Sequence, residues 1–134
     1  MKRKLLVLPW LLYSGLIYIL SSHELDKLPK STILGWDKLL HVVEYSGYSF
    51  LAAVAVLSFA LPRNRFNLYL VAFLMTLFFG ASDEFHQYFI PGRSCSFYDF
   101  VADFVGGILG LIIFQKSKLV NKLQHDNTGK TDCK

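Results

Sequence analysis

Four apolar segments, each long enough or nearly long enough to cross a lipid bilayer, dominate this chain. They cover about residues 5–21, 38–61, 67–90 and 99–115. A hydrocarbon core about 30 Å thick requires about 20 apolar residues in a helix, which satisfies its own backbone hydrogen bonds. Because 53% of the residues are hydrophobic and only 18% are charged, we predict an all-α polytopic membrane protein. We expect four transmembrane helices in a compact bundle, a single domain over residues 1–134, with a polar tail at 116–134.

The first apolar segment is the shortest, and it has two interpretations. Three basic residues precede an apolar run that ends at Leu20, slightly short of a full span. A basic start, an apolar middle and small residues afterwards are also typical of a cleaved secretory signal. No A-x-A cleavage site follows the run, so a retained first helix is favoured. The long side chain of Lys4 can then reach back to the membrane surface.

Basic residues are distributed unequally between the two sides that four spans create. Lys and Arg concentrate in the cytoplasmic connectors of membrane proteins. Near the helix ends, one side carries eight of them: Lys2, Arg3, Lys4, Arg63, Arg65, Lys116, Lys118 and Lys122. The other side carries four: Lys27, Lys30, Lys38 and Arg93. This bias predicts a multi-pass protein of the cell membrane with both termini in the cytoplasm and the two longer connectors outside.

Charge and cysteine usage argue against other classes of protein. The formal charge of +4 comes from residues at the chain ends and in connectors, not from a basic face interleaved with aromatic residues. Nucleic acid is therefore not an expected partner. Cys95 and Cys133 lack the spacing of metal ligands and fall on opposite sides of the membrane in the predicted topology. Neither a disulfide framework nor a zinc site is expected from them.

Acidic residues inside the apolar segments are predicted to lie at similar depths. An ionisable side chain at the bilayer centre costs about 2.5–3.5 kcal/mol on insertion scales, so such residues mark functional sites. At 1.5 Å per residue, Glu44 and Asp83 lie about 10 Å, and Asp103 about 6 Å, from the outer ends of their helices. Glu84 adjoins Asp83. Three helices thus deliver acids to one shallow layer on the outer side.

Helical spacing groups further polar residues with these acids. Residues three or four apart share one face of a helix, so we expect these faces to meet in one site, with Arg93 in the turn above it. Gly106, Gly107 and Gly110 form a small-residue stripe that allows close helix contact. The aligned residues are Asp37, His41, Tyr45 and Tyr48 in the second segment, Asp83 and Gln87 in the third, and Asp99 and Asp103 in the fourth.

A structural role accounts for several of these residues when each is taken singly. His41 suits an interfacial or satisfied core histidine, and Arg93 suits the neutralisation of a buried carboxylate. The adjacent acids Asp83 and Glu84 favour function, because Leu would serve the helix better at both positions. Caps at helix N-termini account for Asp37, Ser94, Ser96 and Asp99.

The polar residues follow one continuous pattern over most of the chain. It reads Asp37-Lys38-x-x-His41-x-x-x-Tyr45, then Asp83-Glu84-x-x-Gln87-x-x-x-Pro91-Gly92-Arg93-x-x-Ser96-x-x-Asp99-x-x-x-Asp103-x-x-Gly106-x-x-x-Gly110. This pattern resembles the VanZ-like family. At position 103 the family pattern usually has Asn, so this chain carries an additional acid. The resemblance implies a few transmembrane helices, no soluble domain, and a relationship to a membrane protein associated with low-level teicoplanin resistance.

Two functions of different classes fit these features. The first is a non-catalytic, envelope-protecting protein whose outer polar pocket binds a lipid-linked envelope precursor or a lipid-tailed glycopeptide antibiotic, with membrane lipids as further partners. The alternative is a small membrane enzyme that acts on a lipid-borne substrate. Its catalytic residues would be His41 with Asp83 or Glu84 as acid and base, and Arg93 would orient an anionic group. We predict the binding role.

The predicted site is acidic, which favours cations. Its only basic residues are Lys38 and Arg93, and acidic residues outnumber them. Binding of a bare phosphate is therefore disfavoured unless acids are protonated or a divalent cation is present. Oxygen ligands suit Mg²⁺ or Ca²⁺ and His41 admits Zn²⁺, but no spacing amounts to a metal motif. Metal dependence, ligand identity and oligomeric state stay open. The candidate ligand-binding residues are Asp37, His41, Tyr45, Asp83, Glu84, Gln87, Arg93, Ser96, Asp99 and Asp103.

Overall fold

The computed structural model describes residues 2–22, 36–59, 64–91 and 96–117, and every regular element in these ranges is helical. The predictions about four residues concern parts of the chain outside the described ranges: Arg93, Cys95, Cys133 and the side chain of Asp37. The elements are the 3-10 helix η1 (Lys2–Val7) and the α-helices α1 (Leu8–Ser21), α2 (Trp36–Phe59), α3 (Arg65–Gln87) and α4 (Phe97–Lys116). The prediction of an all-helical chain is confirmed for the described residues.

Local sequence explains where the helices begin and end. Pro9 lies in the first turn of α1, where its missing N–H and fixed φ are tolerated. The Asn64 side chain caps α3 by accepting a hydrogen bond of 2.8 Å from the backbone N–H of Asn67. The third helix was predicted to reach residue 90, but α3 ends at Gln87. A tighter turn follows, in which the N–H of Ile90 bonds the carbonyl of Gln87.

Three of the helices are long and apolar enough to cross a membrane. These stretches are Lys38–Ser58, Arg65–Gln87 and Phe97–Lys116, of 21, 23 and 20 residues. The apolar stretch Leu5–Ser21 is also helical but is shorter. The described chain thus has the composition of a multi-pass membrane protein with three helices of sufficient length. That the shorter Leu5–Ser21 stretch forms a fourth span stays a prediction.

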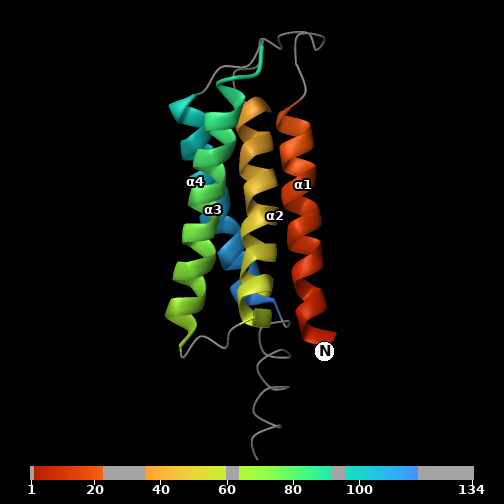
Figure 1. The fold of residues 1–134 in the computed structure, drawn as a ribbon. Coiled ribbons are helices and arrows are strands. Elements are labelled where there is room, and N and C mark those ends of the chain that lie inside the picture. The colour runs from red at the N-terminus through yellow and green to blue at the C-terminus, as the bar shows by residue number, and fades with distance from the viewer. Residues whose placement is uncertain (1, 23–35, 60–63, 92–95, 118–134) are drawn as a thin grey trace, which may run out of the picture.

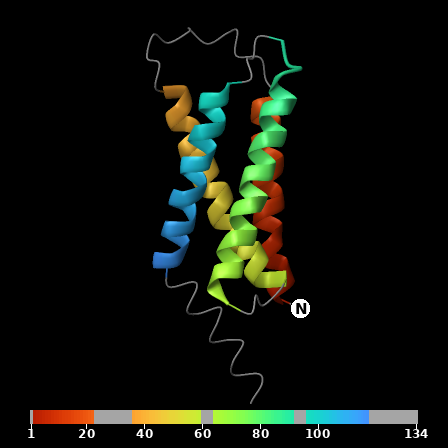
Figure 2. The same ribbon diagram turned by 90° about the vertical axis from the view of Figure 1, so that its left-hand side faces the viewer.

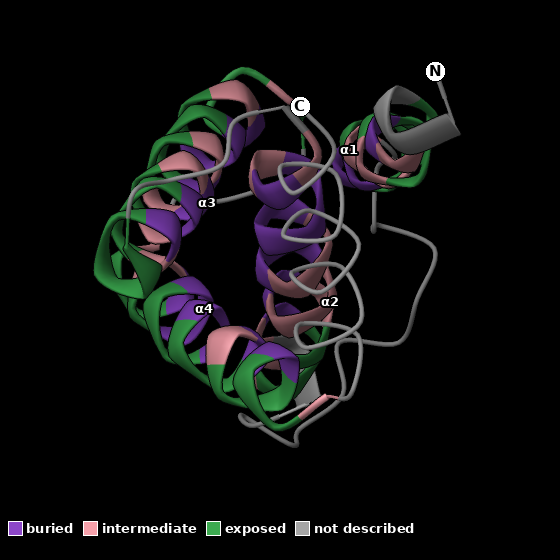
Figure 3. Cartoon of the chain, turned by 90° about the horizontal axis from the view of Figure 1, so that it is seen from below, coloured by how far each residue is buried: buried purple, intermediate pink, exposed green. Residues whose placement is uncertain are grey.

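The helices run alternately up and down in one bundle. The starts of α1 and α3 and the ends of α2 and α4 lie at the same end, so the start of α2, the end of α3 and the start of α4 share the opposite end (Figures 1 and 2). Seen along the bundle, α2 carries the largest buried surface and separates α1 from α4 (Figure 3). Helix α2 is therefore the element against which α1, α3 and α4 pack.

Close contact between α2 and α4 depends on glycine. A Cβ atom built on Gly106 would lie 2.6 Å from the carbonyl oxygen of Val42, and one built on Gly110 would overlap the carbonyl oxygen of Ser46. The Ser49 hydroxyl crosses the same interface and donates a 2.9 Å hydrogen bond to the carbonyl of Gly107. The predicted close helix contact is confirmed: Gly106 and Gly110 face α2, whereas Gly107 faces Phe73 and Thr76 on α3.

Aromatic side chains hold α1 and α3 against α2. The Tyr13 hydroxyl donates a hydrogen bond of 3.2 Å to the carbonyl of Glu44 and lies over Gly47. The ring of Tyr48 on α2 stacks on Phe79 of α3, with centroids 4.5 Å apart. These contacts fill the middle of the bundle with apolar groups, so the polar side chains of α2, α3 and α4 are left to meet near one end.

Candidate functional site

Seven buried polar side chains from three helices form a layer near the end of the bundle where α2 begins. Each is at most 6% exposed. The layer lies within the first turns of α2 and α4 and the last turns of α3, which the antiparallel topology brings to one level. We call this set the polar layer: His41, Tyr45, Asp83, Glu84, Gln87, Asp99 and Asp103.

A histidine–carboxylate pair joins α2 to α4. The Nδ1 atom of His41 lies 2.8 Å from Oδ1 of Asp103, and the Asp103 side chain is 1% exposed. An aspartate bonded to Nδ1 fixes the orientation of the imidazole and directs its Nε2 atom to another partner. The pair therefore requires the acid at position 103.

A second hydrogen-bonded group is centred on Asp83. Its Oδ2 atom accepts hydrogen bonds from the Tyr45 hydroxyl at 3.3 Å and from Nε2 of Gln87 at 2.9 Å. The Tyr45 ring lies nearly parallel to the His41 ring, with centroids 6.3 Å apart. Tyr45 therefore connects the Asp83 group on α3 to the His41–Asp103 pair.

Glu84 reaches toward the start of α4. Its Oε2 atom accepts a hydrogen bond of 3.0 Å from the backbone N–H of Ser96. Ser96 is the N-cap residue of α4, but its side chain makes no capping hydrogen bond. The contribution of Ser96 to Glu84 is thus made by its backbone, an assignment that its residue type could not predict.

Lys38 pairs with Asp99 across α2 and α4. Its Nζ atom lies 2.6 Å from Oδ1 of Asp99, whose side chain is 8% exposed against 36% for Lys38. Asp99 lies in the first turn of α4, one turn inside the N-cap residue. It therefore holds a partner across the helix interface, and the N-cap interpretation of Asp99 is wrong.

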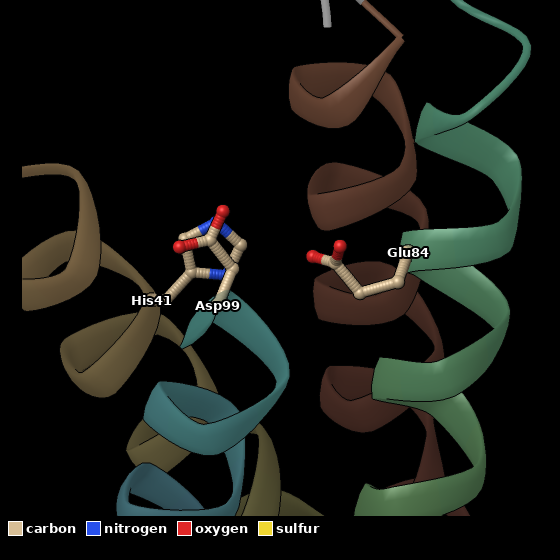
Figure 4. A group of neighbouring side chains, drawn as sticks. All are labelled: His41, Glu84 and Asp99. Carbon is tan, nitrogen blue, oxygen red and sulfur yellow. The ribbon is translucent and has the colours of Figure 1, made fainter. Parts of the chain in front are cut away.

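Three potential metal ligands converge in the layer. Figure 4 shows the carboxylate of Glu84 pointing from α3 toward His41 and Asp99, which lie side by side on α2 and α4. One ligand atom from each of the three residues lies within 4.8 Å of the others. A site of one imidazole and two carboxylates suits a divalent cation.

Buried carboxylate oxygens that lack a hydrogen-bond donor among the described residues include Oδ1 of Asp83 and Oδ2 of Asp103. Oδ2 of Asp103 lies 3.1 Å from the position of a Cβ atom built on Gly80, so this oxygen faces α3 across the space between the helices. Buried polar atoms are rarely left without a donor or a cation. Gly80 was not predicted as part of the site, although an isolated Gly in an apolar helix signals close approach.

The structure brings together most of the residues expected from the sequence. His41, Tyr45, Asp83, Glu84, Gln87, Asp99 and Asp103 share the polar layer, and Ser96 contributes its backbone. Glu44 was expected at the same depth, but it is only partly buried, and its carbonyl bonds Tyr13 on α1. The role of these residues in binding or catalysis stays a prediction.

An apolar groove lies between α3 and α4, on the side of the layer toward the start of α3. It has a volume of about 370 Å³. Its upper part includes Phe104, the neighbour of Asp103, and Gln115 contributes at its other end. Hydropathy alone did not predict the groove, because its side chains resemble any lipid-facing surface. Its apolar lining is Phe66, Tyr69, Leu70, Phe73, Phe104, Ile108, Leu111 and Ile112.

Comparison with known proteins places the chain in a family. No curated protein and no solved structure matches it significantly. The sequence profile of the VanZ/LLP1 family matches residues 6–120, which include all four α-helices and every member of the polar layer. The match covers most of the chain, so this protein belongs to the VanZ/LLP1 family.

Proposed function

We propose that this protein binds an amphiphilic ligand of the cell envelope, with the polar head in the polar layer and the apolar tail along the α3–α4 groove. One observation carries the proposal: on α4 the buried Asp103 of the polar layer is followed directly by Phe104, which lines the apolar groove. A lipid-linked envelope precursor or a lipid-tailed glycopeptide has both parts. Either ligand would connect this chain to teicoplanin resistance, as the family resemblance implies.

The energetic cost of the layer supports a functional role. Asp83, Glu84, Asp99 and Asp103 are all buried within helices that have the composition of spans. Each charged side chain in a span costs about 2.5–3.5 kcal/mol at the bilayer centre on insertion scales, and apolar residues would pack the same helices without that cost. A ligand that interacts with these groups explains why the helices carry them.

The proposed topology places the layer on the outer side of the cell membrane. The eight basic residues on one side against four on the other favour cytoplasmic termini. We propose that the apolar stretch Leu5–Ser21 forms the fourth span. The start of α2 and the end of α3 then face outward, where envelope precursors and glycopeptides are found.

The His41–Asp103 pair favours catalysis as a second candidate function. Asp103 holds the imidazole through Nδ1, as the acid does in histidine-based acid–base sites. Glu84 points toward the same imidazole from α3. In this alternative His41 serves as the base and Glu84 as the acid on the head of a lipid-borne substrate.

Copurified lipids test the binding proposal. Full-length protein is extracted gently, and its bound lipids are identified by mass spectrometry beside those of the Asp83→Ala/Glu84→Ala double variant. Ser82→Ala is the matched control, because Ser82 is exposed on the same turn and its hydroxyl donates a hydrogen bond to the carbonyl of Phe78 in its own helix. We expect one lipid class to be lost from the double variant alone. Identical lipids in all three samples would contradict the proposal.

Glu84→Gln separates binding from catalysis. The amide keeps the shape and an acceptor oxygen for the Ser96 N–H, but it cannot donate a proton as an acid. A protein that binds its ligand through the shape and acceptor oxygen of Glu84 retains its lipid and its effect on teicoplanin susceptibility in this variant at matched membrane abundance. An enzyme retains the lipid but loses the effect.

A further inference from the structure

We propose that the polar layer binds one divalent cation of the first transition series, with Nε2 of His41 and the carboxylates of Glu84 and Asp99 as its protein ligands. These three residues come from α2, α3 and α4, and their ligand atoms lie within 4.8 Å of one another. Ligand atoms at about 2.1 Å from one ion and at a tetrahedral angle to each other are about 3.4 Å apart. A pair at the 4.8 Å limit therefore needs to close by about 1.4 Å, which side-chain rotations on the three helices supply.

The Asp103 carboxylate supports the site from behind the imidazole. A metal-binding histidine almost always donates its other ring N–H to a carboxylate or carbonyl oxygen. Asp103 lies 2.8 Å from Nδ1 of His41 and is 99% buried. Its second oxygen has no hydrogen-bond donor among the described residues and points inward between α4 and α3. A buried carboxylate oxygen without a donor, in the same polar layer as the three ligands, is an observation separate from their mutual distance.

The charge of the layer also favours a cation. Four carboxylates are buried there. Among the described residues, Lys38 pairs with Asp99 and His41 pairs with Asp103. Oδ1 of Asp83 likewise has no donor within the described residues. Carboxylates collected in a low-dielectric environment repel one another. A dipositive ion between α2, α3 and α4 neutralises two of these charges at once.

Ligand chemistry selects the type of metal. Mg²⁺ and Ca²⁺ prefer sets of oxygen ligands, whereas an imidazole with two carboxylates suits Mn²⁺, Fe²⁺ or Zn²⁺. Three protein ligands leave a coordination position for an external group. The cation would thereby allow an acidic layer to hold a phosphate or carboxylate head group. This role rests on the proposed function, whereas the cation site itself rests on the geometry of His41, Glu84 and Asp99.

Zinc titration of the full-length protein tests the site directly. Protein in mild detergent is stripped with a chelator and titrated with Zn²⁺ against a competing dye, in a Cys95→Ser/Cys133→Ser background that removes adventitious thiols. We expect one tight site. Asp103→Asn should weaken Zn²⁺ affinity roughly 10- to 100-fold, as does the loss of a carboxylate that orients a metal-binding histidine. His41→Ala should weaken the affinity further. Equal affinity of Mg²⁺ and Zn²⁺, independent of His41, would overturn the proposal.

Matched controls distinguish the site from surface binding. His86 lies on α3 near the same end and its Nε2 atom is 3.0 Å from the Ser22 hydroxyl, so His86→Ala removes an imidazole outside the ligand set. Glu44→Gln likewise removes an acid of α2 outside it. Both variants should bind Zn²⁺ as the parent does, and an effect as large as that of His41→Ala would refute the assignment. Circular dichroism confirms that each variant is folded.

Lipid retention in the same variants separates this proposal from the proposed function. Loss of Zn²⁺ binding together with the lipid in His41→Ala supports both. Zn²⁺ binding without any change in bound lipid sustains the cation site and contradicts its role in holding the head group. Specific lipid binding by a protein that takes up no Zn²⁺, Mn²⁺ or Fe²⁺ refutes the cation site and leaves the amphiphile-binding function intact.

Discussion

Gly106→Ala should separate α2 from α4 at the level of the polar layer. The added Cβ atom would lie 2.6 Å from the carbonyl oxygen of Val42, whereas ordinary van der Waals contact begins at 3.4 Å. The helices therefore need to move apart by about 0.8 Å, since backbone atoms on both sides cannot rotate away. Val42 and Gly106 are next to His41 and one turn from Asp103, respectively, so the movement acts directly on that pair.

Two consequences of this movement can be given magnitudes. Overpacking a tight interface costs about 1–3 kcal/mol of the free energy of unfolding. The distance between Nδ1 of His41 and Oδ1 of Asp103 is 2.8 Å, and an added separation of about 0.8 Å takes it beyond the range of a good hydrogen bond. The variant should be less stable and should also have lost the bond that orients His41.

Unfolding in mixed detergent micelles measures the first effect, and ¹⁵N NMR of the His41 imidazole measures the second. Gly15→Ala on α1 is the control, because a Cβ atom there has nothing within 4 Å. It should be neutral or stabilising by up to about 1 kcal/mol. Parent-like stability of Gly106→Ala would refute the close contact. A destabilised variant with an unchanged imidazole signal would refute the link between this contact and the polar layer.

Three further outcomes are expected. A membrane-impermeant thiol reagent on intact cells should label Cys95 and leave Cys133 unlabelled, and the opposite result would invert the proposed topology. Lys38→Met should tighten Zn²⁺ binding about fivefold, because an ion pair worth about 1 kcal/mol no longer competes for Asp99; weaker binding would argue against Asp99 as a ligand. Phe104→Trp should fill the upper groove and reduce the bound lipid measured by mass spectrometry, and unchanged lipid would exclude the groove as the tail site.

The positions of the helices could be predicted because hydropathy records them directly. The observed bounds of α2, α3 and α4 differ from the predicted ones by one to three residues at the described ends. The largest difference is at the end of α3, where the chain leaves the α-helix at Gln87 although the next residues are apolar. Apolar composition shows which residues suit lipid, but it does not show where the backbone changes from an α-helix to a turn.

Membership of the polar layer was predictable, but its pairings were not. Depth and helical spacing bring His41, Asp83 and Asp103 to one level, since each helix rises by 1.5 Å per residue. Which acid bonds the imidazole depends on the rotation of α4 against α2, and that rotation is fixed by backbone contacts at Gly106 and Gly110. The bonds of Lys38 to Asp99 and of Ser96 to Glu84 depend on the same packing.

Removing the His41–Asp103 pair altogether tests whether the polar layer serves the fold or the function. Removal of one partner of a buried pair costs about 3–5 kcal/mol, because the other is left buried without compensation. Replacement of both partners by apolar residues is often neutral or stabilising by about 1–4 kcal/mol. Asp103→Leu alone should therefore destabilise the protein, and His41→Leu/Asp103→Leu should restore or exceed the parent stability.

Bound Zn²⁺ and lipid should be lost from both of these variants, whatever their stability. A stable double variant without ligand would show that the pair is kept for binding or chemistry, since α2 and α4 pack equally well without it. If instead the double variant is as unstable as Asp103→Leu, the pair is a structural link between α2 and α4. The acid at position 103 would then serve packing in this chain, and His41 would lose its place among the proposed ligands.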